Sequence, residues 1–138
     1  MSQENVEIVR GAIGPMSQDA ADDKARATSV QRLASGVEFE EDPRFPEAGT
    51  YRGRAEVLRY FTEFVSQFED FVLTVEDLVD AAGDDVLACL HIHGRGKGSS
   101  AEFDVRAGWI FTVRDGEVVR IRAYLDRAEA LEAVGLSE

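Results

Sequence analysis

The chain has 138 residues, with 15 lysines and arginines against 27 aspartates and glutamates, so its formal net charge at pH 7 is −12. This length fits one domain over residues 1–138, and a hydrophobic share of 44% is enough for a buried core. The excess of acidic residues disfavours nucleic-acid backbones and anionic membranes as main partners. The lone Cys89 excludes an intramolecular disulfide and a cysteine-rich zinc site. The start has no basic or apolar region typical of a secretory signal, and no apolar run suits a membrane span, so we expect a cytoplasmic protein.

Helical periodicity predicts three helices in the first half of the chain. The first is expected to end at Gly14-Pro15, because proline cannot continue a helix and disfavours helix in the residue before it. The second runs from about Asp19 to Ala34, with Gly36 as its C-terminal stop. The third, from about Arg54 to Glu69, has large apolar residues at helical spacing along one face.

Strand patterns occupy most of the remaining sequence. The segment from Val37 to Asp42 alternates apolar and acidic residues, as a half-buried strand does, and a loop from Pro43 to Gly53 follows. The segment from Phe71 to Asp126 predicts four long antiparallel strands. Asp115-Gly116 indicates a tight hairpin, in which both central residues need positive φ. A short capped helix is expected after Asp126.

This element order predicts an α+β half-barrel shaped like a cone. A curved, mostly antiparallel sheet needs a layer over one face, and the three N-terminal helices are the candidates to supply it. An apolar cavity is expected between the helices and the concave face of the sheet.

The period of two in the long strands separates an apolar inner face from a polar outer face. The inner face is predicted to contain Ala88, Leu90, Ile92, Phe103, Val105, Ala107, Trp109, Phe111, Val113, Val119, Ile121, Ala123 and Leu125. The outer face is predicted to contain His91, His93, Glu102, Asp104, Arg106, Ile110, Arg120, Arg122 and Tyr124. Two interpretations of the outer face stay open: a solvated surface with cross-strand ion pairs, or a homodimer interface rich in arginine and tyrosine.

Several stretches together resemble the SnoaL-like family of the nuclear transport factor 2-like superfamily. They are SQENVEIVR at the start, VEFEEDP at 37–43, YRGRAEVLRYF at 51–61, the W-x-F-x-x-R-D-G run at 109–116 and VVRIRAYLDRAEALEAVG at 118–135. The resemblance covers nearly the whole chain. It implies a cone-shaped barrel, usually dimeric, with a deep cavity. It does not fix the function, because the superfamily includes isomerases, cyclases, dehydratases and hydrolases as well as noncatalytic binding proteins.

The catalytic pair of the SnoaL-type polyketide cyclases does not carry over. The resemblance places Trp109 at the position of their catalytic histidine and Ala123 at that of their aspartate. Neither side chain acts as a general acid or base. This departure favours a different acid–base pair or a noncatalytic role.

Glu41 and Tyr60 are the candidate catalytic residues. Glu41 shares a strand face with Phe39 and is expected at the cavity mouth as a base, although an acidic rim in solvent would show the same pattern. Tyr60 lies on the third helix, facing the sheet, and is expected to supply a hydroxyl donor, although a core aromatic residue is the simpler interpretation. The predicted cavity-lining residues are Phe39, Phe61, Phe64, Leu90, Ala107, Trp109, Ile121 and Ala123.

Two functional hypotheses therefore remain. The first is a protein that binds a small apolar molecule and acts as a cofactor-independent isomerase, cyclase or hydrolase. The second is a noncatalytic ligand-binding or interaction module. His91 and His93 on one strand face could form a metal pair completed by Glu102 or Asp104, but histidines that pair with neighbouring acids are the plainer interpretation. No metal and no cofactor are expected.

Overall fold

The computed structural model describes residues 2–46, 48–99 and 101–136. Its elements, in chain order, are α1 (Ser2–Asp19), α2 (Asp23–Gln31), β1 (Leu33–Glu40), β2 (Thr50–Arg52), α3 (Arg54–Val65), β3 (Phe68–Asp80), β4 (Asp85–Gly96), β5 (Glu102–Arg114), β6 (Glu117–Tyr124) and α4 (Arg127–Ala133). None of the helices in these ranges is long and apolar enough to cross a membrane.

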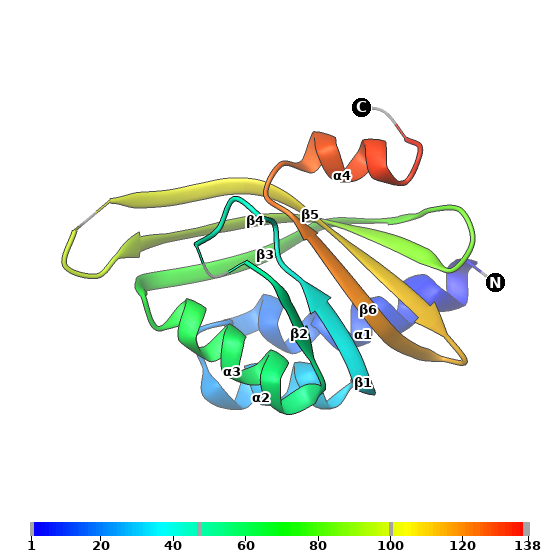
Figure 1. The fold of residues 1–138 in the computed structure, drawn as a ribbon, viewed down its shortest axis with the longest axis horizontal. Coiled ribbons are helices and arrows are strands. Elements are labelled where there is room, and N and C mark those ends of the chain that lie inside the picture. The colour runs from blue at the N-terminus through cyan, green and yellow to red at the C-terminus, as the bar shows by residue number, and fades with distance from the viewer. Residues whose placement is uncertain (1, 47, 100, 137–138) are drawn as a thin grey trace.

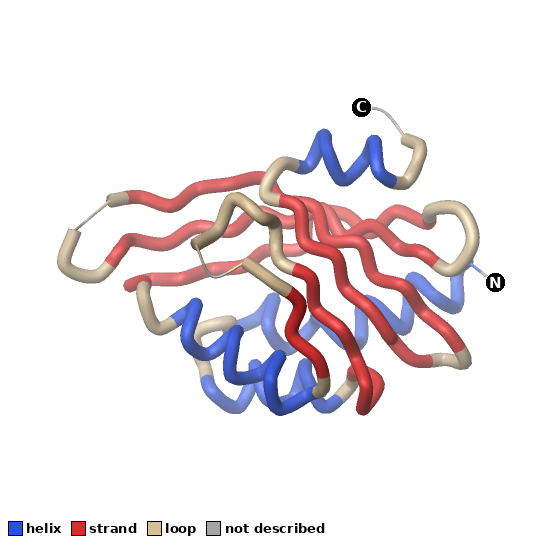
Figure 2. Tube along the Cα trace, viewed as in Figure 1, coloured by secondary structure: helices blue, strands red, loops and turns tan. Residues whose placement is uncertain are grey.

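The strands form one sheet in the order β2-β1-β6-β5-β4-β3, in which β1 and β6 are parallel and the other neighbours antiparallel. Helices α1, α2 and α3 lie against one face of the sheet, and α4 lies on the other (Figures 1 and 2). Register shifts interrupt β3 between Val75 and Asp77 and β5 between Thr112 and Val113, and such bulges bend long strands. The predicted α+β half-barrel is confirmed.

The prediction that α1 ends at Gly14-Pro15 is wrong, since the helix continues through Pro15 to Asp19. Proline has no N–H, so the carbonyl of Gly11, four residues earlier, loses its partner within the helix. Arg32, directly after α2, donates a hydrogen bond from Nη1 to this carbonyl at 2.7 Å. A contact from a residue 21 positions away thus satisfies the carbonyl that proline leaves free.

Several predicted boundaries also differ from the structure. The second helix is shorter than expected and ends at Gln31, so Gly36 lies inside β1 instead of capping a helix. Leu33 pairs with Val118 of β6, and this neighbour keeps the segment extended. The expected loop before α3 contains the short strand β2, whose Arg52 pairs with Glu38. The third helix ends four residues early, at Val65 rather than Glu69.

The predicted alternation of the long strands is otherwise confirmed by burial. Inward-facing residues of β4, β5 and β6 join one core with α1, α2 and α3. On the inner face one position differs: Val118 is fully buried in this core, whereas Val119 is half-buried. The register shift beside Val113 moves the alternation by one residue there. At the next hairpin, Asp115 and Gly116 have φ values of 51° and 77°, as predicted for a tight turn.

The outer face of the sheet is less open than the sequence suggests. Helix α4 covers part of it, and Leu87, Cys89, Ile110 and Ala130 form a second small core there. Ile110 is completely buried, although its register had placed it on an exposed face. Several of the remaining polar residues pair within the chain: Arg106 with Glu76 at 3.4 Å, Arg120 with Glu40 at 2.9 Å, and His91 hydrogen-bonded with Asp104 at 2.7 Å.

Gly108 allows α4 to approach the sheet closely. A Cβ atom on this residue would lie 2.5 Å from the Cβ of Ala130 and 3.3 Å from Leu87 Cδ1. Gly108→Ala is therefore expected to displace α4 and to lower the free energy of unfolding by about 1–3 kcal/mol in chemical denaturation. Gly36→Ala is the matched control, because a Cβ at that strand position meets no atom within 4 Å. Equal stability of the two variants would show that α4 is not packed in this way.

Candidate functional site

An apolar cavity lies between the helices and the concave face of the sheet. Its lining is largely aromatic and aliphatic: Met16, Phe39, Glu41, Phe45, Tyr60, Phe61, Phe64, Val65, Phe71, Leu73, Ile92, Phe103, Val105, Ala107, Trp109, Ala123, Tyr124 and Leu125. The cavity is narrow, with a free volume of about 40 Å³, which is room for a few water molecules. Its walls come from both layers of the fold, so the half-barrel itself creates the site.

Phe39 lies at the centre of the aromatic wall. Its ring centroid is 5.0 Å from that of Phe61, 5.2 Å from that of Trp109 and 5.8 Å from that of Tyr60. The contacts with Phe61 and Trp109 are edge-to-face, a favourable arrangement of two ring quadrupoles. These contacts place the π faces and edges of several rings around one small space.

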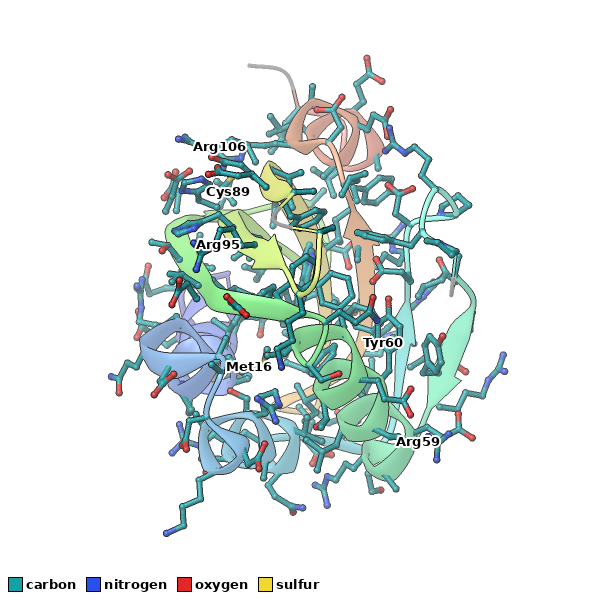
Figure 3. The ribbon with its side chains drawn as sticks, turned by 90° about the vertical axis from the view of Figure 1, so that its left-hand side faces the viewer. Met16, Arg59, Tyr60, Cys89, Arg95 and Arg106 are labelled. Carbon is teal, nitrogen blue, oxygen red and sulfur yellow. The ribbon has the colours of Figure 1, made fainter. Side chains whose placement is uncertain are left out.

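Glu41 and Tyr60 meet at the wall of this cavity. The Tyr60 hydroxyl donates a hydrogen bond to Glu41 Oε2 at 2.5 Å, and the backbone N–H of Asp42 donates to Glu41 Oε1 at 2.9 Å. Tyr60 lies in the interior, between α3 and the sheet, whereas its neighbour Arg59 lies at the periphery (Figure 3). The helix thus directs the phenol inward, and the alternation of β1 continues far enough to bring Glu41 to the same side as Phe39.

The environment of Glu41 makes its charged form less favourable than it is in water. Burial raises the pKa of this carboxyl above its ordinary value of 4.5, and the negative charge of Asp42 adds to the rise. The hydrogen bonds from Tyr60 and from the Asp42 N–H oppose the shift and lower the pKa, but burial is the larger effect. A carboxyl whose pKa is raised in an apolar site is suited to acid–base chemistry near neutral pH.

The structure brings the two candidate catalytic residues together, with one difference from the expected role of Tyr60. Its hydroxyl hydrogen is directed at Glu41, so it supports the carboxylate rather than an oxyanion of a ligand. Six of the eight predicted lining residues lie on the cavity wall: Phe39, Phe61, Phe64, Ala107, Trp109 and Ala123. Ile121 lines a smaller apolar space beyond Phe61 and Trp109. Leu90 is fully buried in the core and belongs to neither lining.

Trp109 and Ala123 occupy directly paired positions on β5 and β6. Both side chains line the cavity. The two side chains that the resemblance places at the positions of the cyclase pair therefore face the cavity, and neither is a general acid or base. This leaves Glu41 as the acidic group on the cavity wall among the described lining residues.

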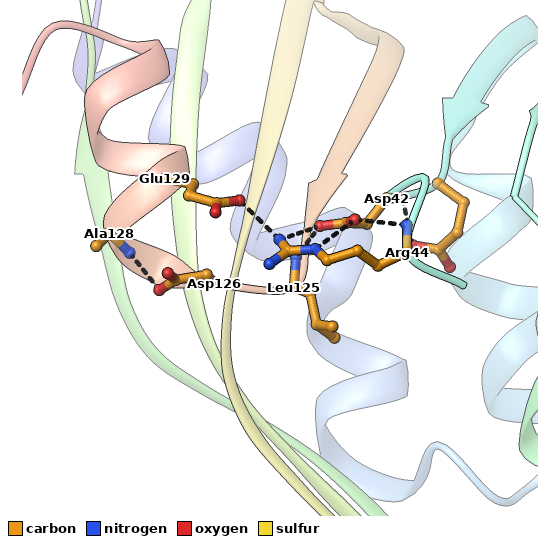
Figure 4. A network of polar contacts seen from close by, with 7 residues as sticks. Asp42, Arg44, Leu125, Asp126, Ala128 and Glu129 are labelled. Atoms are coloured by element: carbon orange, nitrogen blue, oxygen red, sulfur yellow. Dashed lines mark hydrogen bonds and ion pairs between the residues drawn. The ribbon is translucent and has the colours of Figure 1, made fainter.

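A polar network beside Glu41 was not anticipated from the sequence. Asp42 is only 3% exposed and accepts hydrogen bonds from the backbone N–H of Leu125 at 2.7 Å and from three donors of Arg44. Arg44 also donates to Glu129 of α4 at 2.6 Å (Figure 4). The Arg44 guanidinium lowers the pKa of Asp42 to about 2. The sequence signal was the pair Asp42 and Arg44, but its partners lie more than 80 residues away along the chain.

This network borders a wider polar groove next to the cavity. The groove has a volume of about 350 Å³ and is lined by Glu40, Glu41, Asp42, Pro43, Arg44, Arg122, Ala123, Tyr124 and Glu129. Glu41, Ala123 and Tyr124 belong to both linings. Glu41 therefore stands between an apolar interior and a charged surface.

The two histidines lie apart from this site, on the outer side of β4. His91 Nε2 is 2.7 Å from Asp104 Oδ1, and the ring centroids of His91 and His93 are 5.3 Å apart. Within the described residues there is no group of three or more histidine, cysteine, aspartate or glutamate side chains placed to hold a metal ion. The histidine–acid pairing is what the structure contains.

Comparison with known proteins identifies the family. The model of the SnoaL-like domain matches residues 19–121, so the chain belongs to the SnoaL-like domain family. A search of curated proteins found no match. The fold and the cavity described above are those of a member of this family.

Solved structures with this fold cover nearly the whole chain. An NTF2-like protein from Burkholderia thailandensis superposes with a TM-score of 0.76 at 25% identity, over 94% of this chain and 95% of that one. A putative SnoaL-like polyketide cyclase from Jannaschia sp. CCS1 has a TM-score of 0.73 at 18% identity, over 100% and 96%. A Mycobacterium tuberculosis protein in complex with estradiol-17β-hemisuccinate has a TM-score of 0.67 at 16% identity, over 88% and 92%. Identities this low for the last two establish similarity of fold alone.

Proposed function

We propose that this protein binds a small, largely apolar molecule in the cavity and that Glu41 exchanges a proton with it. The observation that carries the proposal is the hydrogen bond from Tyr60 to a carboxyl of raised pKa on the wall of an aromatic cavity. A structural neighbour that holds a steroid ester supports small-molecule binding by this fold. Families with such cavities differ in chemistry, so the proposed reaction rests on the residues of this site.

Isomerisation by proton transfer is the reaction that this pair supports best. Ionised Glu41 would take a proton from one carbon of the ligand and return it to another, which regenerates the carboxylate and consumes no cofactor. Cyclisation or hydrolysis would begin with the same step, with the proton taken from carbon or from water. The hydrogen bond from Tyr60 would hold the carboxylate in one orientation and limit the rise of its pKa.

Entry of a ligand larger than a few atoms requires side chains to move. Phe45, on the loop after β1, is half-buried and lines both the cavity and a second surface groove beside Glu63 and Gln67. Its ring packs edge-to-face on Phe64, with centroids 5.4 Å apart. Rotation of Phe45 would join the two spaces and give a ligand access from the surface.

A noncatalytic ligand-binding module is the second candidate. Trp109 and Ala123 favour it, because the positions that hold the cyclase acid–base pair hold residues unable to transfer protons. The two candidates share the binding site. They differ only in whether Glu41 catalyses a reaction of the bound ligand. The outer face, with exposed Arg106, also supports a proposed homodimer, which light scattering at micromolar concentration would test.

Ligand binding is tested with a panel of small apolar compounds, followed by the fluorescence of Trp109, the single tryptophan, and by thermal stability. A ligand at about 100 times its Kd should stabilise the protein by about 2.7 kcal/mol. Ala123→Leu fills the narrow cavity and should abolish both responses, whereas Ala55→Leu, exposed on α3, should leave them unchanged. Equal binding by Ala123→Leu, or no response to any compound, would refute the proposed site.

A further inference from the structure

The charges around the cavity restrict the kind of ligand that it can hold. We infer that its ligand is cationic at the polar end, in the form of a small alkylated ammonium group that sits between Glu41 and the aromatic wall. This inference rests on the proposed function, because it takes the cavity as the binding site. It adds the chemical class of the ligand, which the acid–base pair alone does not define.

Glu41 is the one charged side chain among the described residues that line the cavity, and no lysine, arginine or histidine is among them. The arginines of the adjoining groove lie outside the cavity lining: Arg44 pairs with Asp42 and Glu129, and Arg122 pairs through Nη2 with Asp85 at 3.4 Å, while its Nε has no partner among the described residues. An anionic ligand would therefore enter an apolar space that contains a carboxyl and no counter-charge. A cationic ligand would supply the counter-charge that the protein lacks there.

The aromatic side chains favour the same class of ligand. Nine of the lining residues are phenylalanine, tyrosine or tryptophan, and ring faces attract cations through their quadrupole. Tyr60 contacts the Glu41 carboxyl directly, and Phe39 packs against both Tyr60 and Trp109 in the same lining, with centroid separations of 5.8 and 5.2 Å. The free-energy cost of removing water is smaller for an alkylated ammonium group than for a bare ammonium ion. Its alkyl groups can also contact the aromatic rings.

Two further features agree with a small cation. Burial raises the pKa of Glu41, so a positive charge beside it would restore the ionised form that burial disfavours. The chain has a formal net charge of −12, and acids outnumber arginines in the groove at the mouth, so the surrounding field attracts cations. Because the free volume is about 40 Å³, an alkylated ammonium group enters only with the side-chain movement described above.

Three probes of nearly equal shape test this inference: choline, its neutral carbon analogue 3,3-dimethylbutan-1-ol, and the anion 3,3-dimethylbutanoate. Binding is followed by Trp109 fluorescence at constant ionic strength, up to about 10 mM, since such small probes bind weakly. Choline should bind at least about tenfold more tightly than the alcohol, and the anion should bind most weakly. Glu41→Gln should reduce the preference for choline to about twofold or less. Glu7→Gln, exposed on α1, removes the same charge outside the lining and should retain the preference.

Each other outcome has a distinct meaning. Equal binding of choline and the alcohol would overturn the cationic class but leave the cavity as a binding site. A preference for choline that survives in Glu41→Gln would overturn it too, because the selectivity would then come from elsewhere. If none of the three probes binds, the inference of a cationic ligand is overturned as well. The panel of small apolar compounds, tested on the wild type and on Ala123→Leu, would then decide separately whether the cavity binds ligands.

Discussion

Glu41→Gln is expected to reduce turnover by about 10²–10⁴-fold for a substrate found through the ligand panel, because glutamine cannot accept the proton. The same substitution should stabilise the folded protein at neutral and higher pH. Burial raises the pKa of Glu41 in the folded state, so the stability it contributes is present below its ordinary pKa and is lost as pH rises through the folded-state value. Glutamine has no such dependence. The stability difference should therefore grow with pH and then become constant.

Kinetics and chemical denaturation between pH 4 and 9 check the two effects together. Glu38→Gln is the matched control, since Glu38 lies on β1 three residues before Glu41, pairs with Arg52 and does not line the cavity. It should change turnover only slightly. Unchanged turnover in Glu41→Gln would remove Glu41 from the mechanism and leave the noncatalytic candidate. A Glu41→Gln variant that loses stability as pH rises, relative to the wild type, would contradict the described burial.

Asp42→Asn should cause the largest loss of stability among single charge removals at this site. The carboxylate of Asp42 is nearly inaccessible, and its pKa is lowered to about 2 from an ordinary value of 3.8 by hydrogen bonds to Arg44 and Leu125. This difference corresponds to about 2–3 kcal/mol of folding free energy at neutral pH. Because the folded-state pKa is lowered, this contribution is present above about pH 4 and is lost as pH falls toward 2.

Urea denaturation of Asp42→Asn at pH 7 and at pH 2.5–3 measures both the size and the pH dependence. The destabilisation should be about 2–3 kcal/mol at pH 7 and clearly smaller at the lower pH. Asp80→Asn, exposed at the end of β3, should stay within about 0.5 kcal/mol of the wild type. A similar small effect for Asp42→Asn would mean that the network around Arg44 does not join the loop to α4.

Local sequence rules predicted the sheet well. Alternation in the long strands identified the inner face, and Asp115-Gly116 gave the hairpin with positive φ in both residues. The errors come from contacts between distant segments. Arg32 satisfies the carbonyl that Pro15 leaves free, and β6 keeps Leu33 extended. Helix α4 buries Ile110, which the alternation had assigned to an open face.

The site likewise combines features that local sequence predicts with features that depend on contacts between distant segments. Residue type and strand position singled out Glu41 and Tyr60 separately, but their hydrogen bond joins residues 19 positions apart in the chain. The partners of Asp42 include the backbone of Leu125, which no side-chain motif reveals. The narrowness of the cavity likewise depends on how rings such as Phe39, Phe61 and Trp109 pack. Sequence patterns identified Glu41, Tyr60 and part of the lining, whereas the remaining members and the geometry of the site depend on packing between distant segments.

The most direct measurement is a carbon-detected NMR titration of the Glu41 carboxyl group, assigned by its absence in Glu41→Gln. The account predicts a pKa above the ordinary value of 4.5, and a further rise in Tyr60→Phe, because the hydrogen bond from Tyr60 lowers this pKa. A Glu41 pKa at or below 4.5, or one that falls in Tyr60→Phe, would contradict a buried carboxyl held by Tyr60 at the cavity wall.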